Sequence, residues 1–392
     1  MTYNCNILKL VLLLCLTLPF SSCLEPVTPQ LNGSDTESAL VVAGQITNEP
    51  GPFRVKLTTS VPVNVMYYAV PVLDADVRII DDKGNSFLLD GDKNGLYETA
   101  DKNLKGVPGN TYTMTITTRE GIQFESSPVL MQEVPDIDSL YFEEVENTEI
   151  SEGQTSTENW LNILLDAHDP EGKTQYWNFK FEETWEVMML TDHVKVLNIQ
   201  EPPAFTFENI TIGDEKNVCW VTKPSNSIIV TSTANSSRDI LKKFRIQSLG
   251  PGEDKLHIGY SILVKQSSIS KELYTYWKQL MDSNENLGGI YGKIPAQVSS
   301  NIKCCNGTSQ ALGYFSASAV KEKRLFINKA QHHVETVSAY KGCAYFDYDL
   351  PSWIPKSYFG IIKGTDIKVY CSADYCADCR AYGTNVKPDF WK

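Results

Sequence analysis

At positions 75–89 the chain reads Ala75-Asp-Val-Arg-Ile-Ile-Asp-Asp-Lys-Gly-Asn-Ser-Phe-Leu-Leu89. Apolar and polar side chains alternate over Ala75–Ile80, a turn-forming Asp-Asp-Lys-Gly follows, and apolar side chains return in Ser86–Leu89. A period of two is the spacing of a strand with one buried face, and a Gly-containing turn between two such runs indicates a hairpin. The stretch therefore predicts a pair of antiparallel strands.

The same pattern continues on both sides of this hairpin. Phe53-Arg-Val-Lys-Leu57 and Thr111-Tyr-Thr-Met-Thr-Ile116 alternate in the same way, and Asn94-Gly95 is a strong turn signal. Short strands at this spacing predict a mainly β fold that begins with an antiparallel sandwich over residues 40–132, of the immunoglobulin-like or transthyretin-like kind. The segment Val134-Pro-Asp-Ile-Asp138 is expected to link it to a second domain.

A larger β-rich domain is expected over residues 139–392. Its clearest strand is Tyr176-Trp-Asn-Phe-Lys-Phe-Glu182, where alternation places three aromatic side chains on one face. These are Trp177, Phe179 and Phe181. One helix is predicted from about Ser270 to Ser283, because apolar residues recur there at helical spacing. They are Leu273, Trp277, Leu280 and Met281. We interpret this stripe as a face that packs on a sheet.

Composition supports packed cores and excludes one class of partner. The chain has 392 residues, of which 42% are hydrophobic, so two domains with buried cores are expected. The formal net charge is −13, and loss of Lys9 with a cleaved leader makes it more acidic still. Because an acidic surface is repelled by phosphate backbones, we expect no nucleic-acid partner.

The beginning of the chain has the pattern of an export signal over residues 1–22. A short polar start with one Lys precedes the apolar run Leu10–Leu18, and Pro19-Phe-Ser-Ser22 follows. The apolar run is shorter than the ~20 residues that span a bilayer. Ser21-Ser22-Cys23 resembles the lipobox of bacterial lipoproteins, although Phe20 stands where an aliphatic residue is usual.

This resemblance implies that cleavage leaves Cys23 first and that lipid is attached to its thiol. A plain secreted protein with a cysteine at this place by chance is the alternative. Residues 23–39 contain Pro, Gly, Ser, Thr and Asp and cannot bury a core, so we expect them to be a tether.

Seven cysteines follow Cys23, all in the second half of the chain. They are Cys219, Cys304, Cys305, Cys343, Cys371, Cys376 and Cys379. Thiols outside the cytoplasm tend to oxidise, and an odd number leaves one over. We predict that Cys376 bonds to Cys379 and that a long-range disulfide joins Cys219 to Cys304 or Cys305, which would staple the second domain.

Four oxygen-bearing residues have the spacing of a calcium-binding loop: Asp90, Asp92, Asn94 and Asp101. An EF-hand needs flanking helices, whereas these flanks alternate like strands. A hairpin turn is therefore favoured over a metal site.

Other chemical motifs are weak. The Cys376-x-x-Cys379 spacing occurs in redox and zinc sites, but it lacks a βαβ setting and a second ligand pair, so a structural disulfide is favoured. His332 and His333 are adjacent, with Glu335 nearby, and on a strand they would point to opposite faces. Asp166–Gly172 has the composition of a turn. We therefore expect no enzyme and no cofactor.

Several longer stretches together resemble a family of uncharacterised outer-membrane lipoproteins of Bacteroidota. The most specific of them is the last, a Gly-Thr-Asn-x-Lys-Pro-Asp-Phe-Trp motif. The stretches are Val41–Pro52, Tyr176–Phe179, Glu183–Glu186, Leu273–Leu280, Leu312–Ser318, Cys376–Arg380 and Gly383–Trp391. That family is typically encoded beside TonB-dependent receptors and has no established catalytic residues.

The resemblance implies an accessory protein that captures a nutrient for a TonB-dependent β-barrel importer at the cell surface. This role is inferred from the setting of such lipoproteins and not from a recognised site. A surface-anchored hydrolase or adhesin that shares only the anchor is the alternative.

Overall fold

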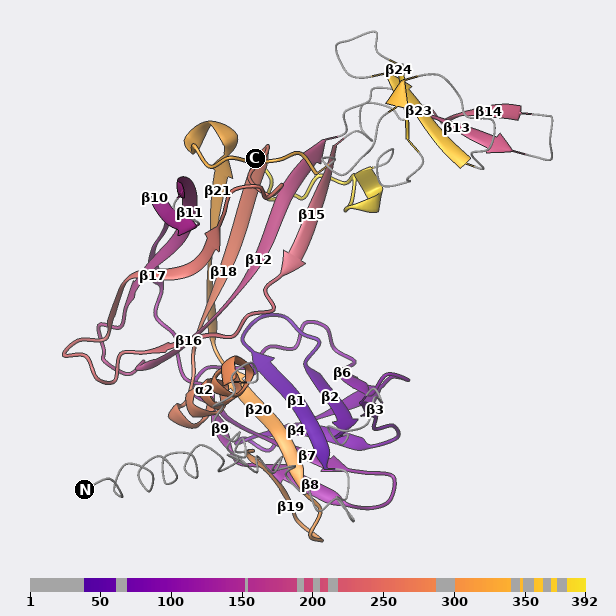
Figure 1. The fold of residues 1–392 in the computed structure, drawn as a ribbon. Helices are drawn as coiled ribbons and strands as arrows, with labels where there is room; N and C mark the ends of the chain where they lie inside the picture. Colours follow the sequence, from indigo (N-terminus) through magenta and orange to yellow (C-terminus); the bar gives the residue numbers. More distant parts are fainter. Residues whose placement is uncertain are drawn as a thin grey trace, which may run out of the picture. The chain divides into compact units, whose positions relative to one another are not determined.

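The structure is a computed structural model that divides the chain into two units, residues 1–37 and 38–392. It describes residues 39–60, 69–151, 154–188, 194–199, 205–210, 218–286, 300–339, 346–347, 356–361, 368–371 and 379–392. The expected signal segment, Cys23 and nearly all of the tether lie outside these ranges. The described part is mainly β, with several sheets and one α-helix (Figure 1). No helix in these ranges is long and apolar enough to cross a membrane.

An 11-stranded sheet, here the first sheet, contains the expected strands of the N-terminal region and two later ones. Its main path runs β19-β8-β7-β4-β5-β6-β2-β1-β20, with β3 beside β2 and β9 beside β7. The bounds are β1 Leu40–Thr47, β2 Arg54–Thr59, β3 Val70–Pro71, β4 Asp76–Asp81, β5 Ser86–Gly91, β6 Leu96–Thr99, β7 Thr111–Thr117, β8 Gln123–Ser126, β9 Val129–Leu130, β19 Ile302–Cys304 and β20 Ala311–Ser318.

Three further sheets and the helix come from the rest of the chain. The three-stranded sheet consists of β10 Ile137–Ser151, β11 Gln154–His168 and β17 Ile240–Leu249. The β12 sheet consists of β12 Tyr176–Met188, β15 Val218–Pro224, β16 Ile229–Ser232, β18 Gly259–Ser268 and β21 Val320–Asn328. A last sheet consists of β13 Val194–Ile199, β14 Phe205–Ile210, β22 Phe346–Asp347, β23 Lys356–Ile361 and β24 Lys368–Cys371. Helix α2 spans Lys271–Asn286, and short 3-10 helices span Lys329–Gln331 and Cys379–Ala381.

The hairpin predicted at positions 75–89 is confirmed as β4 and β5. The strands are antiparallel and Val77 pairs with Leu89. Val77 and Ile79 are fully buried, and the Asp81 carboxylate accepts hydrogen bonds from the backbone N–H groups of Lys83 and Asn85, which hold the turn. Alternation therefore did indicate the buried face correctly.

Strand pairing crosses the domain boundary expected near residues 132–139, so that expectation needs correction. β20 lies parallel to β1 along its whole length, and β19 pairs with β8 (Figure 1). Gly313 makes the β20 pairing possible, because a Cβ there would lie 1.9 Å from the carbonyl oxygen of Val42. The first sheet is thus completed by residues that sequence alone assigned to the second domain.

The second hydrophobic core lies between the three-stranded sheet and the β12 sheet. Trp177, Phe179 and Phe181 are buried in it together, as the alternation predicted. Strand β11 contributes Leu161 and Ile163 from the opposite side. This core and the core of the first sheet are separate clusters.

The predicted helix is confirmed, with its start one residue later than expected. Ser270 precedes it, and the Ser270 hydroxyl accepts a hydrogen bond from the backbone N–H of Leu273 at 3.2 Å, as an N-terminal cap does. Leu273 is buried, and Tyr274 contacts Tyr176 of the β12 sheet with ring centroids 5.2 Å apart. The apolar face thus packs on a sheet.

Candidate functional site

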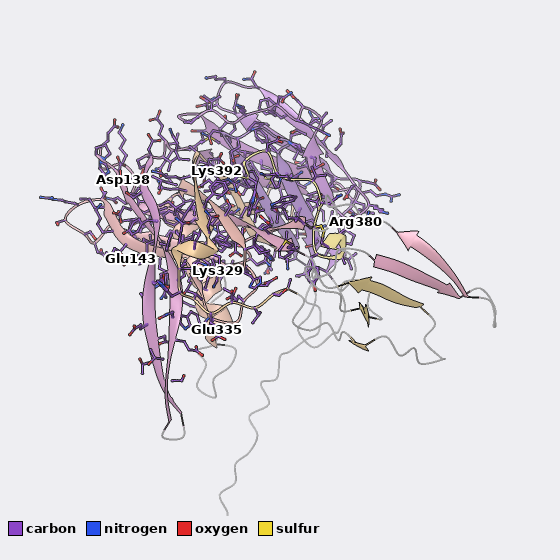
Figure 2. The ribbon with its side chains drawn as sticks, turned by 90° about the horizontal axis from the view of Figure 1, so that it is seen from above. Asp138, Glu143, Lys329, Glu335, Arg380 and Lys392 are labelled. Atoms are coloured by element: carbon purple, nitrogen blue, oxygen red, sulfur yellow. A yellow bond between two sulfur atoms is a disulfide. The ribbon has the colours of Figure 1, made fainter. Side chains whose placement is uncertain are left out.

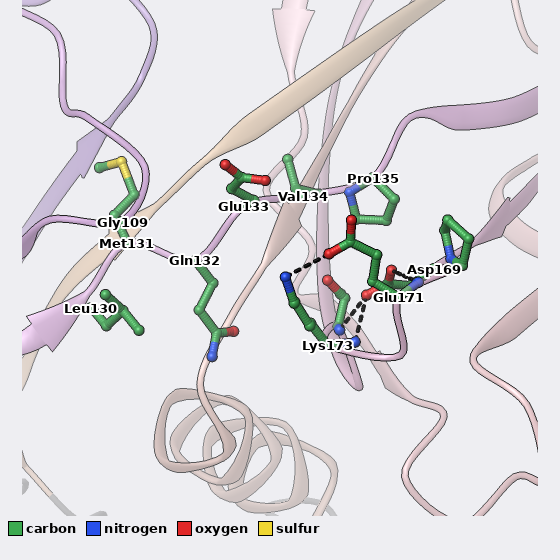
Figure 3. Close-up of a pocket in the computed structure, with 12 residues that line it drawn as sticks. Gly109, Leu130, Met131, Gln132, Glu133, Val134, Pro135, Asp169, Glu171 and Lys173 are labelled. Carbon is green, nitrogen blue, oxygen red and sulfur yellow. Dashed lines mark hydrogen bonds and ion pairs between the residues drawn. The ribbon is translucent and has the colours of Figure 1, made fainter.

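A pocket of about 620 Å³ lies beside the segment that joins β9 to β10 (Figure 3). This segment forms one wall, and the turn that follows β11 forms the other. The lining residues are Gly109, Leu130, Met131, Gln132, Glu133, Val134, Pro135, Asp169, Pro170, Glu171, Lys173 and Thr174. A cavity of this volume with a mixed apolar and polar lining is in the range of small-molecule sites, roughly 300–1,000 Å³.

The first wall is fixed from both sides. Met131 and Val134 are buried in the core of the first sheet. The Ser268 hydroxyl donates to Gln132 Oε1 at 3.1 Å, and the Gln266 amide donates to the Pro135 carbonyl oxygen at 2.8 Å. What the sequence presents as a linker is therefore a wall anchored on strand β18.

The second wall is organised by one carboxylate. Asp169 accepts hydrogen bonds from the backbone N–H groups of Glu171, Lys173 and Thr174, at 2.9, 2.8 and 2.5 Å (Figure 3). Burial raises the pKa of Asp169, but these donors stabilise the charged form more strongly, so the pKa is lowered. The carboxylate is ionised at neutral pH and fully engaged in the turn, as the composition of Asp166–Gly172 predicted.

The remaining charged groups of the pocket are an ion pair and a further carboxylate. Lys173 forms an ion pair with Glu171 at 2.5 Å, and this hydrogen bond raises the pKa of the ammonium group. No His, Ser or Cys is among the described residues that line the pocket. Glu133 contributes a further carboxylate. The arrangement supplies polar contacts and apolar surface for binding.

A buried ionisable cluster lies in the second core, away from this pocket. Glu183 is 6% exposed and accepts hydrogen bonds from the Tyr260 hydroxyl at 2.7 Å and from the Lys255 ammonium at 2.9 Å. Gln247 donates to the same carboxylate at 3.4 Å. Burial, together with the negative charge of Glu183, raises the pKa of Tyr260 well above its usual value. Sequence alternation gave no signal of this cluster, because Glu183 occupies a position expected to be apolar.

The proposed calcium-ligand spacing falls on a hairpin between β5 and β6. The Asp92 carboxylate accepts hydrogen bonds from the backbone N–H groups of Asn94 and Leu96, both at 2.8 Å, and Asp101 accepts one from Asn103. Asp90 lies within β5. Within the described ranges, no group of three or more His, Cys, Asp or Glu residues could hold a metal ion. The carboxylates of Asp92 and Asp101 therefore organise turns.

The predicted disulfide pairing is wrong. Cys219 bonds to Cys379, with Cα atoms 5.6 Å apart and 160 residues between them in sequence. Cys379 therefore does not pair with Cys376, and Cys219 does not pair with Cys304 or Cys305, both of which are free thiols. The remaining candidates, Cys343 and Cys376 and the side chain of Cys371, lie outside the described residues. The short spacing of Cys376 and Cys379 suggested that they bond to each other. The actual partner of Cys379 lies 160 residues away in sequence, and only the fold brings it close.

The adjacent histidines have different surroundings, as expected. His332 is 5% exposed and its Nε2 lies 3.2 Å from the Leu256 carbonyl oxygen. Burial lowers the pKa of His332. His333 is exposed and its Nδ1 lies 3.4 Å from Glu144. The two rings do not share a site.

The most specific motif of the resemblance belongs to a segment, Cys379–Lys392, that lies on the β12 sheet. Thr384 exchanges two backbone hydrogen bonds with Trp220, at 2.8 and 3.0 Å. A Cβ on Gly383 would lie 2.1 Å from the Trp220 carbonyl oxygen, so only glycine fits. The Trp391 ring contacts those of Trp220 and Phe326, with centroids 6.4 and 6.0 Å apart. The motif therefore has a structural role.

Comparison with known protein families gives one match. A family model described as "Domain of unknown function (DUF4249)" matches residues 24–324. No curated protein matches the chain.

Proposed function

The chain belongs to the DUF4249 family, and from that premise we propose that it is an outer-membrane lipoprotein that captures a nutrient for a TonB-dependent importer. Lipid on Cys23 would hold it at the cell surface. The mature protein would bind its ligand without transforming it and would contact the importer's β-barrel directly.

Two observations at the beginning of the chain support the anchor. Ser21-Ser22-Cys23 has the lipobox pattern, and the family match starts at residue 24, directly after the expected lipidated cysteine. A single acyl chain binds a membrane only marginally, but the two or three chains of bacterial lipoproteins suffice.

The observation that carries ligand capture is the pocket between the 130–135 segment and the 169–174 turn. Its walls are fixed by hydrogen bonds, and the carboxylate of Asp169 is already engaged. A preorganised pocket loses little entropy on binding, which favours affinity. The hydrolase alternative would have to use the carboxylates of Glu133 and Glu171 or the hydroxyl of Thr174, which also line the pocket.

The test combines purification and ligand detection. The protein is purified from native membranes in mild detergent, and co-purification of a TonB-dependent β-barrel is expected. Standard stable interfaces bury about 1,600 Å², enough to survive such treatment. Recovery of the lipoprotein without a barrel would reject the importer role and leave the hydrolase or adhesin alternative.

A matched pair of variants tests the pocket itself. Leu130 lines it and is 50% exposed, whereas Leu88 on β5 is 48% exposed and does not line it. Native mass spectrometry after exposure to a digest of polysaccharide and protein should detect bound ligand in the unmodified protein. Leu130→Glu should lose that ligand and Leu88→Glu should keep it. Equal occupancy in both variants would place capture elsewhere.

A further inference from the structure

The three-stranded sheet has one buried face and one open face. On β11, Leu161 and Ile163 are fully buried in the second core. Successive side chains of a strand point to opposite faces, so Trp160 and Asn162 belong to the other face. Strand β17 places Ser248 opposite Asn162 and Arg245 opposite Leu164.

A second pocket, of about 560 Å³, lies where these residues meet. It is distinct from the pocket of Figure 3 and shares no lining residue with it. The lining residues that matter for its chemistry are Val145, Asn147, Trp160, Asn162, Arg245 and Ser248.

Trp160 supplies an aromatic surface held in place by a glycine. The benzo edge of its ring occupies the space next to Gly250, where a Cβ would lie 2.9 Å from Cη2. The indole N–H is buried and has no hydrogen-bond acceptor among the described residues. A buried donor without a partner is costly to the folded state.

Arg245 supplies an unpaired cation. Its neighbours on β17 are engaged, since Lys242 pairs with Asp166 at 3.0 Å and Lys243 with Glu143 at 2.8 Å. Arg245 is exposed and has no ion pair in the part of the chain that the structure describes. The fork of its N–H groups matches a carboxylate.

The amides beside Arg245 are partly free. The Ser248 hydroxyl donates to Asn162 Oδ1 at 2.7 Å, which leaves the Asn162 amide N–H groups available as donors. Asn147 is exposed and adds a second amide. Amides and hydroxyls that both donate and accept suit a ligand rich in hydroxyl groups.

We propose that the open face of the three-stranded sheet binds an acidic saccharide, with a uronate carboxylate on Arg245 and the sugar ring against Trp160. The apolar C–H face of a pyranose ring packs on an aromatic surface, while its hydroxyls bond to the amides. A peptide would pair with the edge of a strand, whereas Trp160 and Arg245 lie on the face of the sheet. This site does not rest on the importer role or on the pocket of Figure 3.

The test measures binding of trigalacturonate to the full chain by isothermal titration calorimetry, with neutral galactotriose as the matched probe. Trigalacturonate should bind, and galactotriose should bind at least about tenfold more weakly, because the charge-assisted bonds are lost. Arg245→Gln should weaken trigalacturonate binding about tenfold to a hundredfold. Arg238, an exposed arginine outside the pocket, provides the control, and Arg238→Gln should change affinity less than twofold.

Two further variants are expected to change the affinity for trigalacturonate in opposite directions. Trp160→Phe keeps an aromatic side chain and should weaken binding of both saccharides, with thermal unfolding reporting whether the fold persists. Glu146 also lines the pocket and repels an anion, so Glu146→Gln should strengthen trigalacturonate binding. Absence of trigalacturonate binding, equal affinity for galactotriose, or an Arg245→Gln variant no weaker than Arg238→Gln would each overturn the proposal.

Discussion

At the scale of single residues, the main departure from the expected pattern is Glu183. It occupies a core position of β12, between Phe181 and Trp185, and is charged where its neighbours are apolar. Burying a carboxylate is costly unless it is paired, and here Tyr260 and Lys255 provide the pairing. These hydrogen bonds join β12 to β18 and to the turn before β18. They define the relative positions of these elements more sharply than apolar packing alone would.

Tyr260→Phe should therefore destabilise the protein. The change removes one hydrogen bond to a buried carboxylate, and the expected loss in the free energy of unfolding is about 1–3 kcal/mol, measured by urea denaturation at pH 7. Tyr112, whose hydroxyl oxygen accepts a hydrogen bond from the backbone N–H of Val107 at 2.8 Å, provides a matched buried tyrosine. Tyr112→Phe should cost less, because its partner is uncharged. A Tyr260→Phe variant as stable as the unmodified protein would contradict this role of Glu183.

Tyr260 also makes the stability of the protein depend on pH. The pKa of Tyr260 is raised in the folded state, so above the unfolded value of about 10 the unfolded chain loses this proton and the folded chain keeps it. Stability is then fully present below pH 10 and falls as pH rises beyond it. Tyr260→Phe should show a shallower fall in stability as the pH rises above about 10. If the curves of stability against pH were parallel for the unmodified protein and Tyr260→Phe, Tyr260 would ionise in the folded state as it does in the unfolded chain.

At the scale of elements, the sequence specified strands and turns well and pairings poorly. Alternation identified β4, β5, β7 and β12, and helical spacing identified α2, because each signal is local. The addition of β19 and β20 to the first sheet, and the Cys219–Cys379 bond, depend on residues far apart in the chain. The pocket in Figure 3 was missed for the same reason: its two walls are a recognised turn and an expected linker, and neither indicates the other.

Gly313→Ala should disrupt the pairing of β20 with β1. Gly313 has φ of +91° and a Cβ there would lie 1.9 Å from the Val42 carbonyl oxygen, so the backbones must move apart. We expect a loss of about 3 kcal/mol or more in the free energy of unfolding. Gly84 has a similar φ of +83° but open space around it, so Gly84→Ala should cost only about 1 kcal/mol of backbone strain. Equal costs would show that the close approach to Val42 is not what requires glycine.

Removal of the Cys219–Cys379 bond should lower stability more than removal of the free thiols. The bond closes a loop across 160 residues, and such constraints on the unfolded chain contribute about 2–4 kcal/mol. The paired change Cys219→Ala with Cys379→Ala should lower the melting temperature by several degrees. Cys304→Ala with Cys305→Ala is the control with the same number of thiols removed and should have little effect. Peptide mapping of the unmodified protein should recover the 219–379 bridge, and its absence would refute the pairing.

At the scale of the whole molecule, the proposed anchor and the described fold have separate tasks. The anchor would lie at Cys23, while the two pockets belong to the part of the chain that begins at residue 39. Cell location should thus be separable from ligand binding by mutation. Both pockets are lined by polar and apolar groups that can contact a ligand.

Cys23→Ala should release the protein from the membrane without unfolding it. Without the thiol no lipid can be attached, so the variant should appear in the soluble fraction. The intact mass of the unmodified protein should exceed that of a chain beginning at Cys23 by the mass of its acyl chains. An unmodified N-terminus that begins at another residue would contradict lipidation at Cys23.

The parallel pairing of β1 with β20 has a consequence for biogenesis. A chain that emerges N-terminus first exposes β1 early, but the partner at residues 311–318 follows only after about 270 further residues have emerged, since contacts of such long range form late. During that interval one edge of the first sheet is unpaired and open to association with other chains. The topology therefore delays completion of the first sheet until most of the polypeptide has been synthesised, and protection of this strand edge matters most until then.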